Sequence, residues 1–403
     1  MEANINTFTI KDTFTSWTWG DLAGLGLVLH IVLMIVMTLR VVSVQRNIGV
    51  SIAWVAVLYT LPIFGFVAYI LLGEPMIGRR YRERVDQASI LMNDMARREH
   101  LIFDKGQDLL PANYRGVSQI GTRWTGFGVF PNHQMQLLTD PASIFQRLIE
   151  DIHAAQRIVL MEFYIVYPKG QVLEVIEALS VAAQRGVECH ILADSVGSFS
   201  FINSSVHRKL EKAGVYVHQS LPVGLFKTLF KRSDLRNHRK MVVIDEHIGY
   251  IGSFNLVDPR FFKQNKNVGQ WIDVALRTTS QHSISINTAM AKVVVTDIGA
   301  ESNDNLAELH QRVNNYTRKL YVMHPTINDL NSRVKVLADT IDDHEQPDIG
   351  ATSIVVPKMP VVDKVLAQLI PSAPQLTAHV IYNTLVSVIH RANKRIRITT
   401  PYF

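Results

Sequence analysis

Two long apolar segments near the N-terminus constrain this chain more than any other feature. Leu22 to Leu39 contains no acidic or strongly basic residue, and Ile52 to Leu72 contains no charged residue. Each has about the 20 residues that a helix needs to cross the hydrocarbon core of a bilayer. The preceding stretch lacks the short basic region of a secretory signal peptide. The sequence therefore predicts two transmembrane helices over residues 22–74, after an N-terminal tail of residues 1–21. Two buried helices of a soluble protein are the alternative.

The lysines and arginines around these segments predict their orientation. The loop between the segments carries Arg40 and Arg46. The flanking chain carries five such residues: Lys11, Arg79, Arg80, Arg82 and Arg84. Cytoplasmic segments are the richer in lysine and arginine, so we expect both ends of the helical hairpin, and the catalytic part of a multi-pass protein, on the cytoplasmic side.

The composition narrows the class of protein. Hydrophobic residues make up 47% of the 403 residues and charged residues 19%, which excludes a disordered chain. The net charge of +6 favours an anionic partner such as nucleic acid, an anionic lipid surface or a phosphorylated substrate. Cys189, the single cysteine, excludes an intramolecular disulfide and is expected to be buried.

Helical and strand patterns alternate in the polar part of the chain. Residues 75–130 are expected to form a juxtamembrane connector, and residues 131–280 an α/β domain whose alternation indicates a mostly parallel sheet. The polar, turn-rich residues 281–374 are interpreted as a connector. Residues 375–403 are interpreted as the start of a second copy of the domain, because Ile389 to Phe403 echoes Ile152 to Tyr164; a chance echo is the alternative.

The stretch "NHRKMVVIDEHIGYIGSFN" carries the candidate chemistry. Side chains alternate along a strand, so His238 and Lys240 are expected on one face and Arg239 on the other. An imidazole beside an ammonium group can attack or protonate a phosphoryl group and hold its oxygens. Asp245, at the strand end, is expected to secure a turn or a cationic partner. Taken singly, these residues also suit an ordinary basic strand edge.

A turn after the next strand adds further donors. Gly252 permits the turn, and Ser253 and Asn255 bring a hydroxyl and an amide toward the expected phosphate pocket. The nearby histidines and acids do not have the spacing of a zinc or two-metal site, so we expect neither metal nor cofactor.

The whole pattern, H-x-K, four residues, D, six residues, G-S-x-N, resembles the signature of the phospholipase D superfamily. It is matched at His238, Lys240, Asp245, Gly252, Ser253 and Asn255. The hydrophobic hairpin, the strand "EFYIV", the segment "LADSVGSFSF" and "VDPRFFKQNKNVGQWID" resemble those of bacterial cardiolipin synthases. The resemblance implies an α/β fold in which the hairpin precedes a phospholipase D-like α/β/α sandwich lobe, followed by a second lobe that is incomplete here.

The same resemblance implies an activity. The family comprises enzymes of the bacterial inner membrane that convert two phosphatidylglycerols into cardiolipin and glycerol. One motif histidine forms a phosphatidyl-histidine, and the histidine of a second motif protonates the leaving glycerol. The 403 residues contain one such motif. We therefore expect that the chain is inactive alone unless a partner, possible as a homodimer, supplies the second; a homodimeric phosphodiesterase or nuclease is the alternative, although no nucleic-acid partner is expected.

A few other polar residues are weaker candidates. Arg260 is expected to help hold a second phosphate. Gln270 and Asp273 are candidates to orient His238 through its second ring nitrogen. Glu162 is expected either in the site or paired in the core, and Asp194 either in the site or as a helix cap.

Overall fold

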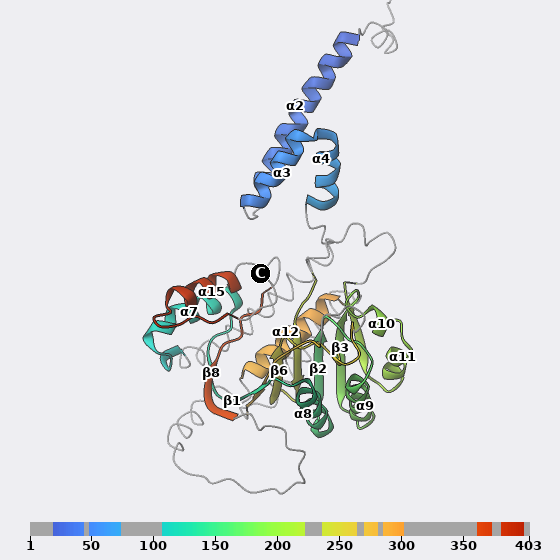
Figure 1. Cartoon of the computed structure of the whole chain (residues 1–403), viewed down its shortest axis with the longest axis vertical. Coiled ribbons are helices and arrows are strands. Elements are labelled where there is room, and N and C mark those ends of the chain that lie inside the picture. The colour runs from blue at the N-terminus through green and yellow to red at the C-terminus, as the bar shows by residue number, and fades with distance from the viewer. Residues whose placement is uncertain are drawn as a thin grey trace, which may run out of the picture. The chain divides into compact units, whose positions relative to one another are not determined.

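The computed structural model divides the chain into two units, described here separately (Figure 1). It describes residues 19–43, 48–73, 107–221, 236–263, 270–280, 285–301, 361–372 and 380–398. Most of the expected N-terminal tail, the arginine cluster after the second apolar segment and most of the expected connector lie outside these residues.

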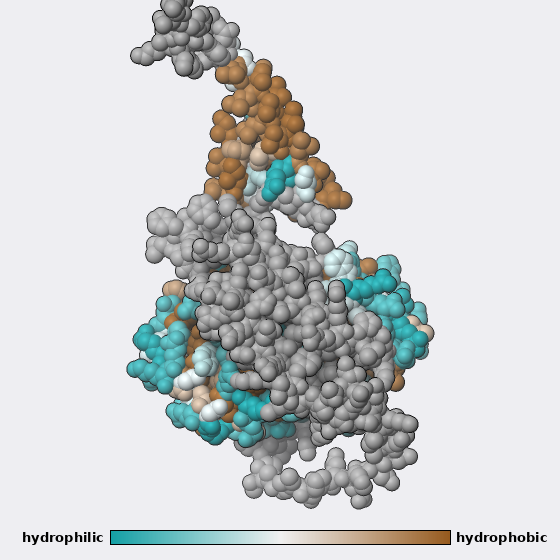
Figure 2. All heavy atoms as spheres, turned by 180° about the vertical axis from the view of Figure 1, so that it is seen from behind, coloured by the Kyte–Doolittle hydropathy of each residue, from teal (hydrophilic) through white to brown (hydrophobic). Residues whose placement is uncertain are grey.

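The first unit consists of hydrophobic helices. Helix α2 spans Trp19–Ser43, and its part Ala23–Ser43, with a mean hydropathy of 2.4, is long and apolar enough to cross a membrane. In the part of the chain that the structure describes, it is the one helix that meets this criterion. Hydrophobic side chains cover the surface of this unit (Figure 2). An exposed apolar surface of this extent is typical of a site of contact with a membrane or another protein.

The second apolar segment is interrupted. Helix α3 (Ile48–Thr60) ends before Pro62, α4 (Pro62–Ala68) follows, and the π-helix η1 spans Tyr69–Gly73. Proline lacks a backbone N–H and disfavours a helical conformation at the residue before it, so the helix breaks there. The 13 residues of α3 rise about 20 Å, less than the roughly 30 Å of a hydrocarbon core. The second apolar segment is thus interrupted at Pro62, and the two-pass topology stays a prediction.

The second unit is built on a mixed eight-stranded sheet in the order β4-β3-β2-β5-β6-β7-β1-β8. The strands are β1 (Phe130–Leu138), β2 (Ile158–Phe163), β3 (Glu188–Asp194), β4 (Tyr216–Ser220), β5 (Lys240–Ile244), β6 (Ile248–Gly252), β7 (Ala275–Thr279) and β8 (Val361–Ala367). Strands β2, β3 and β4 are parallel, and every other neighbouring pair is antiparallel. The expectation of a mostly parallel sheet is therefore wrong. The three residues between β5 and β6 form a short turn, and only antiparallel strands can be joined so closely.

Helices cover both faces of this sheet. The helices of this unit are α7 (Ala112–Thr125), α8 (Pro141–Ala154), α9 (Gln171–Gln184), α10 (Phe199–Ile202), α11 (Ser205–Lys212), α12 (Ile286–Glu301) and α15 (Val380–His390). Of these, α8, α9 and α11 pack on one face of the sheet and α12 on the other. One hydrophobic core joins the sheet to α8, α9 and α11, and includes Val242 and Ile244 of β5. The other joins it to α12 and includes Met241 and Val243. The alternating side chains of β5 thus supply both cores, which gives the expected three-layer α/β/α lobe.

The lobe extends beyond the boundary that we expected at residue 280. Helix α12 contacts β2, β4, β5 and β6, and β8 pairs with β1. Three polar side chains of α12 are also buried: Asn287, Thr288 and Lys292. These polar residues make the segment look like a solvated connector in the sequence, although the structure places it in the core.

Helix α15 contacts α7, and the Arg391 guanidinium donates a hydrogen bond of 2.7 Å to the Asn113 carbonyl. Aligning Ile152 with Ile389 pairs the buried residues of α8 with exposed residues of α15. The α8 residues Ile144, Phe145, Leu148 and Ile152 are at most 2% exposed. Their α15 counterparts Ile381, Tyr382, Leu385 and Ile389 are at least 41% exposed. The second copy of the domain stays a prediction, and this match of apolar positions supports it.

The Asp245 carboxylate joins the β5–β6 turn to the start of β2. Its Oδ2 accepts a hydrogen bond from the Gln156 backbone N–H at 2.8 Å. Its Oδ1 accepts from the N–H groups of Arg157 and Ile158 at 2.8 and 2.9 Å. The Arg157 guanidinium also donates to the Asp245 carbonyl. The carboxylate therefore fixes β5 against β2.

Replacing Leu148 by Ala should lower the free energy of unfolding by about 2–5 kcal/mol, because it leaves a cavity under α8. The matched change Leu385→Ala, at an exposed position of α15, should alter it by no more than about 0.5 kcal/mol. Denaturant titration of the full chain in detergent measures both, and equal losses would contradict the assignment of the two helix faces.

Replacing Asp245 by Ala should lower the free energy of unfolding by about 2 kcal/mol, because three backbone N–H groups lose their charged acceptor. Asp245→Asn keeps one side-chain oxygen and should lose less. The same titration compares the two variants. Equal stability of Asp245→Ala and the unaltered chain would show that the carboxylate does not hold the turn.

Candidate active site

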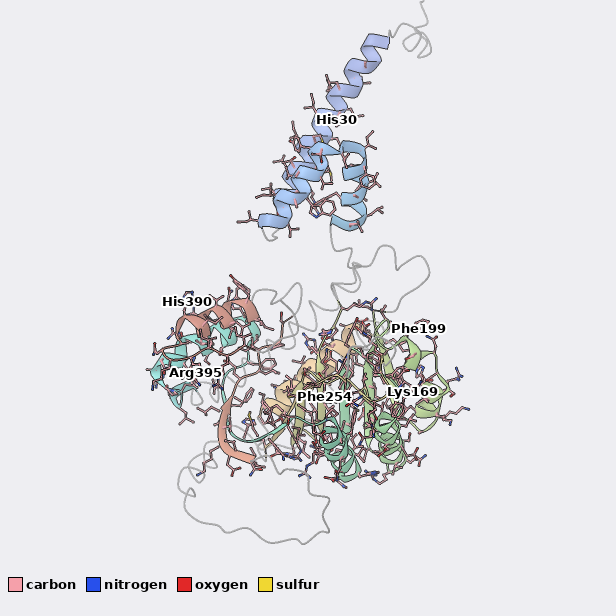
Figure 3. All side chains as sticks on the ribbon, viewed as in Figure 1. His30, Lys169, Phe199, Phe254, His390 and Arg395 are labelled. Carbon is pink, nitrogen blue, oxygen red and sulfur yellow. The ribbon has the colours of Figure 1, made fainter. Side chains whose placement is uncertain are left out.

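The motif residues lie at one edge of the sheet, which we call the motif edge. Here β2, β3 and β6 end, and β5 and β7 begin, as the pairing of Phe163 with Lys240 and of Gly252 with Ala275 shows. Side chains that follow or precede five different strands therefore gather at one place. Phe254, labelled in Figure 3, is buried just below this edge against Phe163.

His238 and Lys240 contact each other. The Lys240 ammonium lies 3.0 Å from Nδ1 of His238 and donates a hydrogen bond of 2.7 Å to the His238 carbonyl. An ammonium group has no acceptor, so Nδ1 accepts this hydrogen bond and the neutral ring carries its proton on Nε2. Nε2 is thus a hydrogen-bond donor in this state.

Tyr164 completes the immediate surroundings of His238. Its ring lies 4.7 Å from the imidazole, centre to centre, and 5.6 Å from the Lys240 ammonium. Partial burial and then the Lys240 charge lower the pKa of His238, against the opposing effect of Asp194. The ring is therefore mostly neutral at neutral pH. We did not identify Tyr164 as a site residue from the sequence, although it directly follows the strand that pairs with β5.

Burial lowers the pKa of Lys240. The side chain is 6% exposed, and its desolvation lowers its pKa to about 8, while Asp273 and Glu162 act in the opposite direction. The positive charge is thus present at neutral pH and is lost a short way above it. A phosphate oxygen at this position would supply the missing counter-charge.

Asp273 precedes β7 at the motif edge. Its Oδ1 accepts a hydrogen bond of 2.8 Å from the Ser253 hydroxyl, which in turn accepts one from the Val274 N–H at 3.1 Å. Burial raises the pKa of Asp273, opposed by the Ser253 hydrogen bond and by Lys240. Ser253 is exposed and Gln270 is exposed. The role of Asp273 or Gln270 in orienting His238 stays a prediction.

The turn after β6 is shaped by Gly252 and Asn255. A Cβ on Gly252 would lie 2.1 Å from the Val274 carbonyl oxygen, so β6 and β7 can approach only with glycine there. Asn255 is buried, and its side-chain oxygen accepts a hydrogen bond of 3.1 Å from the Ile165 N–H. Gly252 and Asn255 therefore fix the backbone around the site. Their predicted role in substrate binding stays a prediction.

Arg260 is held in place by Asp258. The buried Asp258 carboxylate accepts hydrogen bonds from the Arg260 guanidinium at 2.6 and 2.9 Å, and another from the Gln171 N–H at the start of α9. These contacts lower the pKa of Asp258 against its burial. The Arg260 side chain is 55% exposed, so the guanidinium still faces solvent.

Three other polar residues lie on the α12 side of the sheet. Asn237 donates to the buried Glu162, and Arg239 pairs with Asp297 of α12. Burial, and then the charge of Asp297, raise the pKa of Glu162 well above its ordinary value, against the effect of Arg239. Glu162 is thus paired in the core, and it acts on Lys240 only through its charge.

Asp194 has a structural role in the described residues. Its Oδ1 accepts hydrogen bonds from the N–H groups of Val196 and Gly197, and both oxygens accept from the Arg236 guanidinium. It therefore shapes the loop after β3 rather than capping α10, and holds Arg236 two residues before His238. No group of three or more histidine, cysteine or acidic side chains that could hold a metal ion lies together in the described part of the chain.

Comparisons with known proteins agree on one superfamily. The family model "Cardiolipin synthase, PLD-like domain" matches residues 148–286, and "Phospholipase D-nuclease N-terminal" matches residues 32–74. The chain is 31% identical to cardiolipin synthase A of Erwinia tasmaniensis over 91% of its own length and 66% of the relative's. It is 36% identical to cardiolipin synthase A of Escherichia fergusonii over 67% of this chain and 54% of that relative. The chain thus spans about half to two thirds of these relatives.

Solved structures give weaker similarities. NucT from Helicobacter pylori matches with a TM-score of 0.30 and 18% identity, covering 41% of this chain and 97% of that one. Nuc, a phospholipase D family member from Salmonella typhimurium, matches with a TM-score of 0.31 and 16% identity, covering 44% and 99%. The assignment therefore rests on the sequence relatives and the family model, and the chain belongs to the phospholipase D superfamily, in the family of the bacterial cardiolipin synthases.

Proposed function

We propose that this chain takes part in phosphatidyl transfer between two phosphatidylglycerol molecules, which yields cardiolipin and glycerol. The observation that supports it is the contact between His238 and Lys240 at 3.0 Å, on an edge where the imidazole is exposed. The reaction would take place at the cytoplasmic side of the inner membrane, with the apolar helices as a two-pass anchor. The chemistry requires no metal or cofactor.

Two histidines share the work in this proposal. One imidazole attacks the phosphorus, forms an N–P bond and breaks the bond to the leaving glycerol oxygen, which takes a proton from the other imidazole. The hydroxyl of a second phosphatidylglycerol then attacks the phosphorus, gives its proton back to that imidazole and releases the first histidine. The Lys240 ammonium stabilises the charge on the phosphoryl oxygens in both steps.

The residues around His238 divide the remaining roles. Lys240 keeps the proton of the neutral imidazole on Nε2. To protonate a leaving group, His238 must first become an imidazolium with a second proton on Nδ1, which requires Lys240 to give up this hydrogen bond. Nucleophilic attack through Nε2 requires Nδ1 to donate to an acceptor instead. Ser253 and Arg260 are the exposed groups placed to bind substrate oxygens, while Gly252 and Asn255 hold the wall of the pocket.

A second histidine must come from another copy of the motif, since residues 1–403 contain one. We propose that a second H-x-K lobe supplies it across the motif edge. A second copy of this chain is the supplier that can be tested directly, because it would bring two His238 side chains together.

Replacing His238 by Ala should reduce cardiolipin and glycerol formation by at least about 10²-fold, the lower end of what one positioned acid or base contributes. The assay uses the full chain in lipid nanodiscs with phosphatidylglycerol labelled either in its terminal glycerol, which reports glycerol release, or in its phosphate, which stays on the histidine in the intermediate. A labelled adduct on the His238 peptide would identify this residue as the nucleophile. Unchanged turnover by His238→Ala would contradict the proposal, and cleavage of nucleic acid without a lipid product would favour a nuclease.

Mixing the two forms tests the dimer. If two copies of His238 form one site, equal amounts of unaltered and His238→Ala chains leave only about a quarter of the pairs intact, provided that pairing is random. Activity that falls in simple proportion to the unaltered chain would show that each chain acts without its copy.

The pH dependence should report Lys240. Because its pKa is lowered to about 8, kcat/KM should fall as the pH rises through 8 and the ammonium loses its charge. A guanidinium stays charged, so Lys240→Arg should move this fall to higher pH even if the overall rate is lower. An alkaline limb at the same pH in both forms would show that another group titrates.

A further inference from the structure

The Tyr164 ring lies against both members of the catalytic pair. Its centre is 4.7 Å from the centre of the His238 imidazole, and the Lys240 ammonium lies over the ring at 5.6 Å. None of the roles in the proposed reaction uses this side chain. Because the face of an aromatic ring is electronegative, a ring in this position acts on the charge of both neighbouring groups.

The backbone turns at Tyr164 and brings its ring to the pair. Alternation along β2 would place Tyr164 with Leu160 on the α12 side of the sheet. Tyr164 instead forms a bend after the strand, and its ring contacts His238 on the other side. The Ser198 hydroxyl fixes this bend, since it donates to the Tyr164 carbonyl at 3.1 Å and accepts from the Val166 N–H at 2.9 Å. A hydrogen bond outside the sheet thus sets the direction of the ring.

The loop after β3 packs closely on Tyr164. A Cβ on Gly197 would lie 2.2 Å from the Tyr164 carbonyl oxygen and 3.2 Å from Cε2 of its ring, so only glycine permits this approach. The Asp194 carboxylate holds the same loop, because it accepts hydrogen bonds from the N–H groups of Val196 and Gly197 at 2.9 and 2.8 Å. The loop therefore keeps the ring in contact with His238.

The surroundings of the pair oppose positive charge. Burial lowers the pKa of His238 and that of Lys240, and the Lys240 charge lowers the pKa of His238 further. The proposed reaction nevertheless needs an ammonium and, for a time, an imidazolium side by side. The carboxylates that face the pair act on it through their charge: Asp194, itself paired with Arg236, on His238, and Asp273 and Glu162 on Lys240.

We infer that Tyr164 is a positioning residue of the proposed transfer, and that its ring, fixed by the loop after β3, stabilises the protonated form of His238 and the charged form of Lys240. A carboxylate in direct contact with the pair would stabilise these cations more strongly, but it would also repel a phosphate. An aromatic ring favours cations and carries no net charge. The inference rests on the proposed function, in which His238 becomes an imidazolium before a leaving group takes its proton.

The protonation of His238 tests the inference without turnover. The full chain in nanodiscs is treated with diethylpyrocarbonate, which reacts with the neutral imidazole and not with the imidazolium. Mass spectrometry of the His238 peptide gives the rate at each pH, and the pH of half-maximal rate reports the pKa of this residue.

Three substitutions at one position separate the ring from its hydroxyl and from its shape. Tyr164→Phe keeps an electron-rich ring, and Tyr164→Leu removes it. Tyr164→trifluorophenylalanine keeps an aromatic ring of similar shape but makes its face electron-poor. The matched control is Tyr167→Leu, which removes another partly buried ring of the motif edge that contacts Phe262 and the Lys169 ammonium instead.

The half-maximal pH should fall by about half a unit in Tyr164→Leu and in the fluorinated variant, because the imidazolium loses one cation–π contact. It should stay unchanged in Tyr164→Phe and in Tyr167→Leu. In the two variants that shift, kcat for cardiolipin formation should fall about 5-fold with little change in KM, which corresponds to the loss of one such contact in the transition state.

An unchanged or higher half-maximal pH in the fluorinated variant would overturn the inference, and this variant decides the matter if Tyr164→Leu does not fold. An equal fall in Tyr164→Phe would also overturn it, because the effect would then belong to the hydroxyl. So would an unchanged kcat in the variants that shift. A chain that forms no cardiolipin, yet shows the shift, would contradict the proposed function and leave the effect of Tyr164 on His238 standing.

Discussion

The antiparallel pairing of β5 with β2 is the constraint on which the candidate site depends. It places Lys240 opposite Phe163 and Ile244 opposite Val159. A slip of one residue would turn His238 and Lys240 toward α12 and bring Arg239 to the other face. The Asp245 carboxylate opposes such a slip, because its three backbone hydrogen bonds exist only in the observed register. The catalytic pair is thus positioned from the far end of the strand.

The same pairing separates two kinds of polar group across the thickness of the sheet. His238, Lys240 and Tyr164 contact one another on one side. Arg239, Glu162 and Asp297 interact on the side of α12. Burial lowers the pKa of Lys240 to about 8, against the charges of Asp273 and of Glu162. A bound phosphate would stabilise the charged form of this lysine, because it supplies a counter-charge where burial has removed water.

Apolar surface is exposed in several places in the described residues, among them the helices α2 to α4, helix α15 and the motif edge. Only the last is combined with stacked lysines and aromatic rings next to a reactive imidazole. The α15 surface has instead the pattern of a helix made to cover a sheet, as α8 does. The three surfaces thus differ in composition.

The sequence alone determined the features that depend on local order along the chain. The apolar helix α2, the strands and helices from β2 to β4, the motif and the sharing of one face by His238 and Lys240 follow from hydrophobic periodicity and strand alternation. Tertiary structure decided the rest. Antiparallel neighbours replaced the expected parallel ones, and α12 entered the core despite its polar residues. The sequence predicted that Asp245 secures a turn or a cationic partner, but it did not identify the partners: the N–H groups at the start of β2 for Asp245, Arg236 for Asp194 and the Ile165 N–H for Asn255. Their partners are set by which strands become neighbours, and residue spacing carries no information about that pairing.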